Sequence, residues 1–549
     1  MLKSIKKLSA LLLCIALVLS CIGCAGKGSG TNSGTNSGTS NGTSSSTDTN
    51  SDASSDNGNG SSTGNNTSED LGASSNTSTN VSSAKLLSKY ADTITGVFDE
   101  KNIVLTFAAL SDTHLAGNEQ QYQSSYDRFT KAINSCEKFA TTKKLDAICI
   151  AGDVGNCTNS PANVIGIKDG QTIAQAQAEQ GKIERENFLR AILDAADPAT
   201  KLFYCLGNHD GFKGTNAQLY IDSFSGKNKQ YYNRFYGDDL DKEALVKGNR
   251  HVKINGYNFL ALEASAEGKV DADGYAWLES KIKSIIAEDP KQTIFLFHHY
   301  PPTSLAFATA GQNSEIRKVL EKYPQVIIFA GHIHAQIDFD NTIMQSDKGY
   351  IAVNCGSVKN INETRLVTIA GDTALNVKNS DMAEQSQGMV VEVDKSGNVR
   401  ISRYNFVLGK KIASSFVIPA VKKDGTRSLD YTKDRKNKIS APEFISNNIS
   451  AEMSGTNIKL TFPAAACPTQ KVYRYEVTVT NTSTNQKSKV QYVSSLFYKY
   501  ATPADMPKEY SVTFNPGITM SKGTYKIEVI AVDSWPLKSK PLTYQLVVK

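Results

Sequence analysis

The chain has 549 residues, of which 40% are hydrophobic and 21% are charged, and its formal net charge is +6. At about 150 residues per domain, this length indicates more than one domain and enough apolar residues for a buried core. The small net charge argues against a dedicated nucleic-acid-binding protein, which would carry a basic stripe. No long heptad or apolar runs occur in the body of the chain, which disfavours coiled-coil and multi-span membrane classes.

Residues 1–24 have the pattern of a signal peptide. Three lysines precede the apolar stretch 8–20, which is too short to span a membrane comfortably. Cys21 and Cys24 each end a short segment that resembles a bacterial lipobox, in which the cysteine is lipidated after cleavage. We expect lipidation at Cys24, with Cys21 or a simple secretory signal as alternatives. The expected location is the outer face of the bacterial cytoplasmic membrane, through an N-terminal lipid anchor, or secretion.

Residues 25–83 are almost entirely Ser, Thr, Asn and Gly, with a few Asp. Such a segment cannot bury enough apolar surface to offset the entropy lost on ordering. We therefore expect a disordered tether between the anchor and the folded part of the chain.

Residues 84–410 are predicted to form an α/β domain. Five short apolar runs bounded by loop residues predict buried strands at 103–110, 147–151, 202–206, 293–297 and 326–330. One predicted helix carries five apolar residues on one side: Trp277, Leu278, Ile282, Ile285 and Ile286. The pair Asn255-Gly256 between apolar flanks predicts a hairpin turn.

Residues 411–440 are rich in Lys and Ser and are expected to be a linker, and residues 441–549 alternate with a period of two. Four side chains in this part are predicted to face the same way: Tyr473, Tyr475, Val477 and Val479. The segment 525–532 repeats the alternation and resembles the penultimate strand of fibronectin type III domains. The expected fold is an all-β sandwich of the immunoglobulin or fibronectin III type.

Six of the seven histidines lie in loops that directly follow apolar runs. Strand-end loops of open α/β sheets converge into one crevice, so these loops are expected to meet. In chain order the segments are Ser111-Asp112-Thr113-His114, Gly152-Asp153, Gly207-Asn208-His209-Asp210, His298-His299-Tyr300 and Gly331-His332-Ile333-His334. Carboxylate, imidazole and amide donors without a thiolate suit Mn, Fe or Zn. Each segment alone is more often an ordinary turn, but the five together predict a metal site.

These five segments, in this order, resemble the motifs of the calcineurin-like metallophosphoesterases over about residues 105–353. The resemblance implies an α/β fold with a four-layer α/β/β/α sandwich and two divalent or trivalent metal ions. The implied ligands of one ion are Asp112, His114, Asp153 and His334. The implied ligands of the other are Asp153, Asn208, His299 and His332, with the Asp153 carboxylate as the bridge.

The resemblance also implies roles for the neighbouring residues. His299 is preferred over His298 as the ligand because a residue and then Pro301 follow it, and His298 is expected beside or beneath the site. A hydroxide that bridges the two metal ions would attack phosphorus. His209 would act as general acid or stabilise the leaving group, and Asp210 is a candidate for orienting His209.

The loop after Asp153 departs from two branches of the family. Purple acid phosphatases have a metal-binding tyrosine three residues after this aspartate, and Asn156 occupies that position here. Protein Ser/Thr phosphatases need Asp and Arg in the same loop, which this chain lacks. The loop is closer to members that resemble cyclic-nucleotide phosphodiesterases.

The expected function is an exported, metal-dependent phosphoesterase that acts on a small phosphomonoester or phosphodiester, with no nucleic acid as partner. The alternative is a cell-surface protein whose C-terminal sandwich binds wall or glycan while the phosphoesterase domain is a scaffold. The sequence leaves the substrate open, because the loops that would line a pocket carry no recognised motif.

Overall fold

The computed structural model describes residues 97–156, 164–210, 248–264, 268–306, 313–361, 374–377, 384–467 and 470–549. All described residues belong to one compact unit within residues 80–549. The expected signal peptide, with Cys21 and Cys24, and the expected tether lie outside the described residues. Over the part of the chain that the structure covers, no helix has the length and apolar character to cross a membrane.

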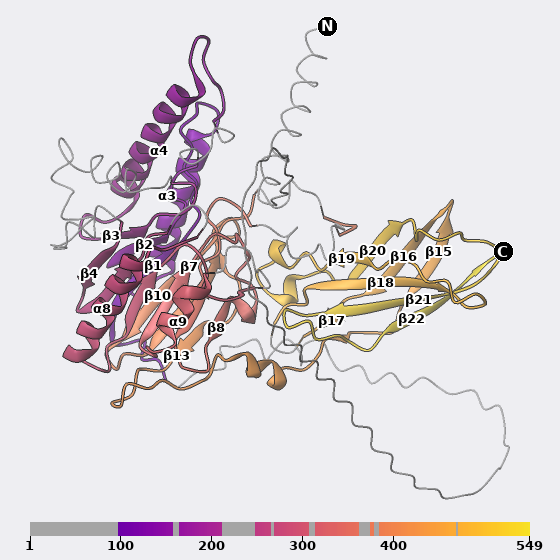
Figure 1. Cartoon of the computed structure of the whole chain (residues 1–549). Helices are drawn as coiled ribbons and strands as arrows, with labels where there is room; N and C mark the ends of the chain where they lie inside the picture. Colours follow the sequence, from indigo (N-terminus) through magenta and orange to yellow (C-terminus); the bar gives the residue numbers. More distant parts are fainter. Residues whose placement is uncertain are drawn as a thin grey trace, which may run out of the picture. The chain divides into compact units, whose positions relative to one another are not determined.

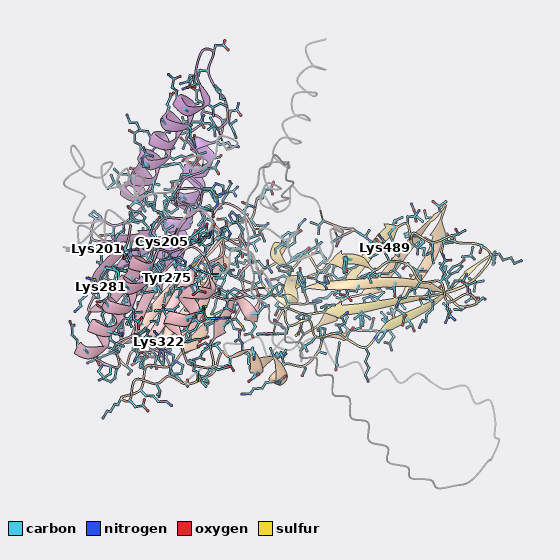
Figure 2. The ribbon with its side chains drawn as sticks, in the orientation of Figure 1. Lys201, Cys205, Tyr275, Lys281, Lys322 and Lys489 are labelled. Atoms are coloured by element: carbon cyan, nitrogen blue, oxygen red, sulfur yellow. The ribbon has the colours of Figure 1, made fainter. Side chains whose placement is uncertain are left out.

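The first sheet has seven strands in the order β12-β11-β10-β1-β2-β3, with β13 paired to β11. Figure 1 labels β1, β2, β3, β10 and β13 of this sheet. The strands are β1 (Ile103–Leu110), β2 (Ala147–Ala151), β3 (Lys201–Cys205), β10 (Gln387–Asp394), β11 (Val399–Asn405), β12 (Lys410–Lys411) and β13 (Phe416–Ile418). β1, β2 and β3 are parallel, so their carboxyl ends lie at one edge. Lys201 and Cys205 mark the two ends of β3 (Figure 2).

The second sheet has six strands in the order β4-β5-β6-β7-β9-β8. The strands are β4 (Arg250–Ile254), β5 (Tyr257–Ala261), β6 (Ile294–Phe297), β7 (Val326–Ala330), β8 (Ile343–Gln345) and β9 (Ile351–Asn354). β5, β6, β7 and β9 are parallel. The predicted hairpin turn joins β4 and β5, and both of its residues are left-handed, with φ 48° at Asn255 and 82° at Gly256.

The strands predicted from apolar runs are confirmed as β1, β2, β3, β6 and β7, with differences of at most one residue at their ends. Phenylalanines from both sheets form one hydrophobic cluster. Phe107 of β1 contacts four rings of the second sheet at centroid distances of 5.0–6.4 Å: Phe259, Phe295, Phe297 and Phe329. The edge-on geometry of these contacts is the one that aromatic quadrupoles favour.

Helices pack against each sheet. α3 (Tyr122–Phe139) and α4 (Ile173–Ala195) share a hydrophobic cluster with β1, β2 and β3. α8 (Ala272–Glu288) and α9 (Ser314–Leu320) share another with β5, β6 and β7. The predicted apolar face of α8 is confirmed, because Leu278, Ile282 and Ile285 belong to that cluster and Trp277 and Ile286 are partly buried against it.

The segment 411–440, expected to be a linker, is part of the folded α/β region. β13 lies within it and pairs with β11, and Phe416 and Ile418 are buried in the cluster that contains both sheets. A 3-10 helix, η5 (Lys433–Lys438), follows. The prediction failed because the short apolar run of β13 lies within a segment rich in lysine, and this run adds a strand to the first sheet.

The C-terminal region is rich in strands. A three-stranded sheet has the order β15-β16-β20, a four-stranded sheet has the order β19-β18-β21-β22, and β14 pairs with β17. The elements are β14 (Glu443–Phe444), β15 (Ser450–Ser454), β16 (Asn457–Pro463), β17 (Ala465–Ala466), β18 (Arg474–Asn481), β19 (Gln491–Ser494), η6 (Phe497–Lys499), η7 (Pro503–Asp505), β20 (Glu509–Phe514), β21 (Gly523–Val532) and β22 (Leu542–Val548).

The predicted alternation in β18 places Tyr475, Val477 and Val479 in a core to which both C-terminal sheets contribute. Tyr473 does not join them. It precedes the strand and is buried in a separate cluster with Phe339 of the α/β region. The position next to the strand end explains this difference from the sequence expectation.

Candidate metal centre

The five histidine-bearing and aspartate-bearing loops follow β1, β2, β3, β6 and β7, and the structure brings their side chains together. Backbone hydrogen bonds hold neighbouring loops in register. Asp112 N donates to Gly152 O at 3.0 Å, and His114 N donates to Asp153 O at 3.0 Å. Gly331 N donates to His299 O at 3.0 Å, which ties the loops of the second sheet in the same way.

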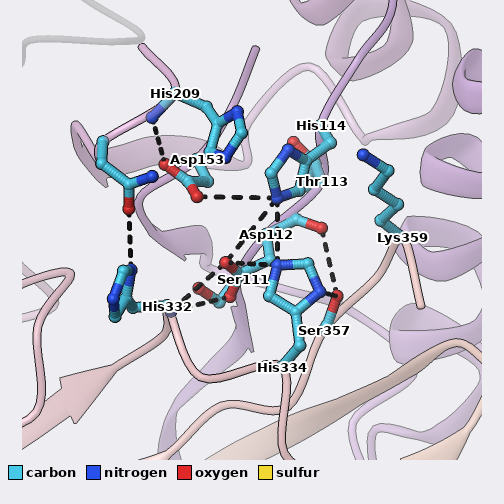
Figure 3. A network of polar contacts seen from close by, with 12 residues as sticks. Ser111, Asp112, Thr113, His114, Asp153, His209, His332, His334, Ser357 and Lys359 are labelled. Carbon is cyan, nitrogen blue, oxygen red and sulfur yellow. Dashed lines mark hydrogen bonds and ion pairs between the residues drawn. The ribbon is translucent and has the colours of Figure 1, made fainter. Parts of the chain in front are cut away.

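The first group of side chains consists of Asp112, His114, Asp153 and His334, whose candidate ligand atoms lie within 4.8 Å of one another (Figure 3). His334 Nε2 is 3.1 Å from Asp112 Oδ1 and 3.1 Å from His114 Nε2. His114 Nε2 is 3.5 Å from Asp153 Oδ2. These atoms surround one point at which a cation could be bound.

The second group consists of Asp153, Asn208, His299 and His332. His299 Nε2 is 3.2 Å from Asp153 Oδ2 and 3.1 Å from Asn208 Oδ1. His332 Nδ1 is 2.7 Å from the same Asn208 oxygen. The Oδ2 atom of Asp153 is therefore close to a histidine of each group.

Backbone hydrogen bonding orients two of the imidazoles. His299 Nδ1 donates to Ala151 O at 2.8 Å, and His334 Nδ1 donates to Asn360 O at 3.1 Å. A proton on Nδ1 leaves Nε2 with its lone pair directed into the group, which is the form that binds a metal.

Five of the seven candidate ligands lie on strand-end loops with an uncommon backbone conformation. The φ angles are positive at Asp112 (53°), His114 (42°), Asp153 (51°), His332 (69°) and His334 (47°). A left-handed conformation costs a residue with a side chain about 1–3 kcal/mol and persists only where its surroundings fix it. Such concentration of strain in one place is typical of a functional site.

Motif glycines allow these loops to approach closely. A Cβ at position 331 would lie 2.7 Å from Asp112 Oδ2, and one at position 207 would lie 2.3 Å from Asp153 Oδ1. A Cβ at Gly152 would lie 2.5 Å from His299 Nδ1. Glycine at Gly207 and Gly331 therefore leaves room for the two carboxylates that face the centre.

Burial and charge oppose each other among these groups. Burial would raise the pKa of Asp153, but the positive charges of His299, His209 and His114 hold it well below its usual range. Burial lowers the pKa of His299, but the charge and hydrogen bond of Asp153 prevail and raise it to about 9. Burial and the charge of His299 lower the pKa of His332 to about 3. The site therefore favours an ionised Asp153 next to a cation.

The donor set fits the expected metal ions. The two groups offer two carboxylates, four imidazoles and one amide oxygen, all converging and with no thiolate among them. Such mixed oxygen and nitrogen donors suit Mn, Fe or Zn. The sharing of Asp153 between the groups provides for two ions side by side.

His209 lies beside the first group. Its backbone N–H donates to Asp153 Oδ1 at 2.7 Å, and its Nδ1 donates to Asn156 O at 3.0 Å. Its ring meets the His114 ring edge-on, at 4.5 Å between centroids. The bond to Asn156 O orients the imidazole.

Asp210, the candidate for orienting His209, also anchors the backbone through its carboxylate. It accepts hydrogen bonds from Val154 N (3.1 Å), Gly155 N (2.6 Å) and Gly207 N (2.7 Å). Burial and the charge of Asp153 raise the pKa of Asp210 to about 7. Asp210 thus joins the loop after β2 to the loop after β3.

His298 and His251 lie apart from the two groups. His298 is fully buried, with Nδ1 donating to Leu262 O at 2.9 Å and Nε2 3.4 Å from Asn313 Nδ2. His251 bonds Asn258 across the β4–β5 hairpin at 2.8 Å.

The loop after β9 also reaches the site, through Ser357 and Lys359, although neither residue was among those predicted from the sequence. Ser357 Oγ lies 3.3 Å from His334 Nδ1, and Lys359 Nζ donates to Asn156 Oδ1 at 2.9 Å (Figure 3 shows Ser357 and Lys359). Asn156 Oδ1 is in turn 3.3 Å from His114 Nδ1. An apolar run followed by Gly-Ser at 351–357 was a signal for this loop, but it contains no histidine or carboxylate.

Residues 105–336 match the family model described as calcineurin-like phosphoesterase. A search of curated proteins found no match. Among solved structures, a purple acid phosphatase from yellow lupin (Lupinus luteus) seeds is similar at 14% identity and a TM-score of 0.36, over 59% of this chain and 55% of that chain. A spore cortex lytic enzyme of Clostridium perfringens is similar at 8% identity and a TM-score of 0.15, over 77% of this chain and 85% of that chain. A chitinase of Bacillus thuringiensis is similar at 9% identity and a TM-score of 0.16, over 81% of this chain and 84% of that chain.

The family match confirms a calcineurin-like phosphoesterase domain at residues 105–336.

Proposed function

We propose that this protein is a dinuclear metal-dependent phosphoesterase that hydrolyses a small phosphomonoester or phosphodiester. The observation that carries the proposal is the position of Asp153 Oδ2, 3.5 Å from His114 Nε2 and 3.2 Å from His299 Nε2. One carboxylate between two groups of metal donors is the arrangement that a two-metal site requires. The family match over residues 105–336 supports the same reaction class.

The proposed metal ligands follow the two groups. One ion would be held by Asp112, His114, Asp153 and His334. The other would be held by Asp153, Asn208, His299 and His332. When bound, two such ions would lower the pKa of a water and neutralise charge on the phosphoryl oxygens.

His209 is proposed as the proton donor to the leaving oxygen. Its Nδ1 donates to Asn156 O, and this bond fixes the orientation of the ring beside His114. A protonated imidazole at this position can release its Nε2 proton as the ester bond breaks. Asp153 Oδ1 holds the backbone of His209 and so fixes this ring relative to the two ligand groups.

For the fold, we propose the four-layer α/β/β/α sandwich followed by a β-sandwich of the immunoglobulin or fibronectin III type. Support for the first comes from three hydrophobic clusters, one shared by the two sheets and one between each sheet and its helices. Support for the second comes from the single core to which the three-stranded and four-stranded sheets both contribute.

We also propose export and lipid anchoring at Cys24, on the basis of the signal-like sequence of residues 1–24. A Cys24→Ser variant should lose incorporation of labelled fatty acid and appear in the medium, whereas Cys21→Ser should keep both label and membrane fraction. Unchanged labelling of the Cys24→Ser protein would refute this assignment.

The enzymatic proposal is tested with a panel of phosphomonoesters and phosphodiesters, with metal content measured on the same preparation. Chelator-treated protein should be inert and should regain hydrolysis when Mn, Fe or Zn is restored. A protein that holds two metal ions and hydrolyses no member of the panel would overturn the proposal.

A further inference from the structure

Segments between the strands of the C-terminal region contact the loop that follows the candidate ligand His334. We define this loop, residues 335–342, as the His334 loop. Asp338 Oδ1 lies 2.5 Å from Lys471 Nζ. Asp340 Oδ2 accepts a hydrogen bond from Trp535 Nε1 at 2.9 Å. Asn341, next along the loop, donates from Nδ2 to Ser534 O at 2.7 Å.

The ion pair between Lys471 and Asp338 is fully buried, with exposed side-chain fractions of 0% and 1%. Lys471 Nζ also donates to Phe497 O at 3.3 Å and to Tyr500 O at 2.7 Å. Asp338 Oδ2 accepts from Gln387 Nε2 at 2.8 Å. Because both charged groups are satisfied in a low-dielectric interior, their separation is strongly constrained.

The His334 loop also makes apolar contacts with the C-terminal region. Phe339 is buried against Tyr473 and Phe497, at centroid distances of 5.5 and 4.5 Å. Ile361 belongs to the same cluster, and its neighbour Asn360 supplies the carbonyl that accepts from His334 Nδ1. His334 is therefore flanked on two sides by segments packed against the C-terminal region.

His334 needs such support because its backbone is in the left-handed region, with φ 47°, as is that of His332, with φ 69°. This conformation is unfavourable for a residue with a side chain unless neighbouring structure enforces it. A one-ångström change in the path of the loop would move both imidazoles relative to Asp112.

We propose that the C-terminal region, through the segments between its strands, positions the metal centre, and that Lys471 is a positioning residue that acts through Asp338 on His334. This inference rests on the proposed ligand set. It makes the C-terminal region part of the catalytic unit, because a site built partly on its contacts depends on its presence.

The test compares Lys471→Met with Lys459→Met in the full chain, using Co²⁺ added to chelator-treated protein as the probe. Lys459 is the control, since it is a lysine of the same region whose ion pair is with Glu452 of β15 and whose strand, β16, contributes to the separate C-terminal core. Binding is followed by calorimetric titration and by the visible absorption of bound Co²⁺, and folding by urea denaturation. Lys471→Met should weaken Co²⁺ binding about tenfold and change the absorption bands, as expected for a residue that orients a ligand. Lys459→Met should leave both unchanged.

Trp535→Phe provides a milder variant in case Lys471→Met does not fold, because it removes the indole N–H that donates to Asp340 while it keeps an aromatic ring and all buried charges. It should weaken Co²⁺ binding severalfold. A folded Lys471→Met protein, or in its absence a Trp535→Phe protein, with wild-type affinity and spectrum would overturn the inference. Failure of the wild-type protein itself to bind Co²⁺ would instead refute the proposed ligand set.

Discussion

Asp153 uses its two carboxylate oxygens for different contacts. Oδ1 accepts a hydrogen bond from the backbone of His209, whereas Oδ2 lies between His114 and His299. The same side chain thus fixes the proposed proton donor relative to both groups of metal ligands. At the scale of single residues, the proposed chemistry depends on this one connection.

His209→Ala should reduce turnover by about 10²–10⁴-fold while leaving the metal content unchanged, because His209 is a proton donor in our account and not a ligand. The reduction should be larger for esters with poor leaving groups, which need the proton most. Rates with a series of aryl phosphates of graded leaving-group pKa measure this. His251→Ala, on the β4–β5 hairpin, is the control. An equal loss for good and poor leaving groups would contradict the role.

Glu263 should make the stability of the protein depend on pH. Burial and the charge of Asp210 raise its pKa from 4.5 to about 8, against the opposing hydrogen bond from the backbone of Leu206. Between these two values the folded protein keeps a proton that the unfolded chain releases, so the free energy of unfolding falls as the pH rises.

Glu263→Gln removes this proton and should make the decline shallower by up to about 1.4 kcal/mol per pH unit in that window. Urea denaturation at a series of pH values measures the slope. The exposed Glu452→Gln change serves as the control and should leave the slope as it is. A Glu263→Gln protein with the wild-type slope would show that Glu263 is ionised in the folded state.

At the scale of elements, the site is built where parallel strands of two sheets end, and motif glycines allow the loops to meet. Gly331 illustrates the requirement, since an added Cβ would lie 1.7 Å from Ser111 Oγ and 2.7 Å from Asp112 Oδ2. The loop after β7 cannot approach the loop after β1 with any larger residue at this position.

Gly331→Ala should therefore weaken metal binding about tenfold by displacing Asp112. Gly274→Ala is the matched control, because its Cβ would lie 2.7 Å from Val270 Cγ1 at the start of α8, away from the ligands. It should lower the free energy of unfolding by about 1–3 kcal/mol through overpacking and leave metal affinity intact. Equal metal affinity in the two variants would argue against the steric role of Gly331.

Elements with local signals could be predicted from the sequence, whereas contacts between distant segments could not. The turn at Asn255-Gly256 depends only on adjacent residues that tolerate positive φ, and it is present as predicted. The pair Lys471 and Asp338 is separated by 133 positions and belongs to no periodic pattern. For the same reason the carbonyl of Asn360, which orients His334, had no signature in the sequence.

The positions of the candidate histidines could be predicted because their loops directly follow strands, and the fold then brings the strand ends together. The hydrogen bonds that hold these loops and imidazoles in place could not be predicted from the sequence. The Asp210 carboxylate holds three backbone N–H groups, and Asn156 O accepts a hydrogen bond from His209 Nδ1. Neither contact follows from residue type, because only the three-dimensional path of the loops decides which backbone groups lie within hydrogen-bond distance.

At the scale of the whole molecule, the α/β region and the C-terminal region belong to one compact unit. A buried ion pair and an aromatic cluster join the two regions. In our account the C-terminal region completes the support of His334 while the parallel strands present the other ligands. The catalytic unit would then extend well beyond residues 105–336, which match the family model.

The most direct test of the central claim is the metal content of the purified protein and of Asp153→Asn, measured by elemental analysis together with phosphoesterase turnover. Because Asp153 is shared by both groups, its loss should disturb both ions. We predict about two metal ions per wild-type chain. Asp153→Asn should hold at most one and lose nearly all turnover, while Asp127→Asn on the exposed surface of α3 should match the wild type. An Asp153→Asn protein that keeps both ions and full turnover would contradict the account.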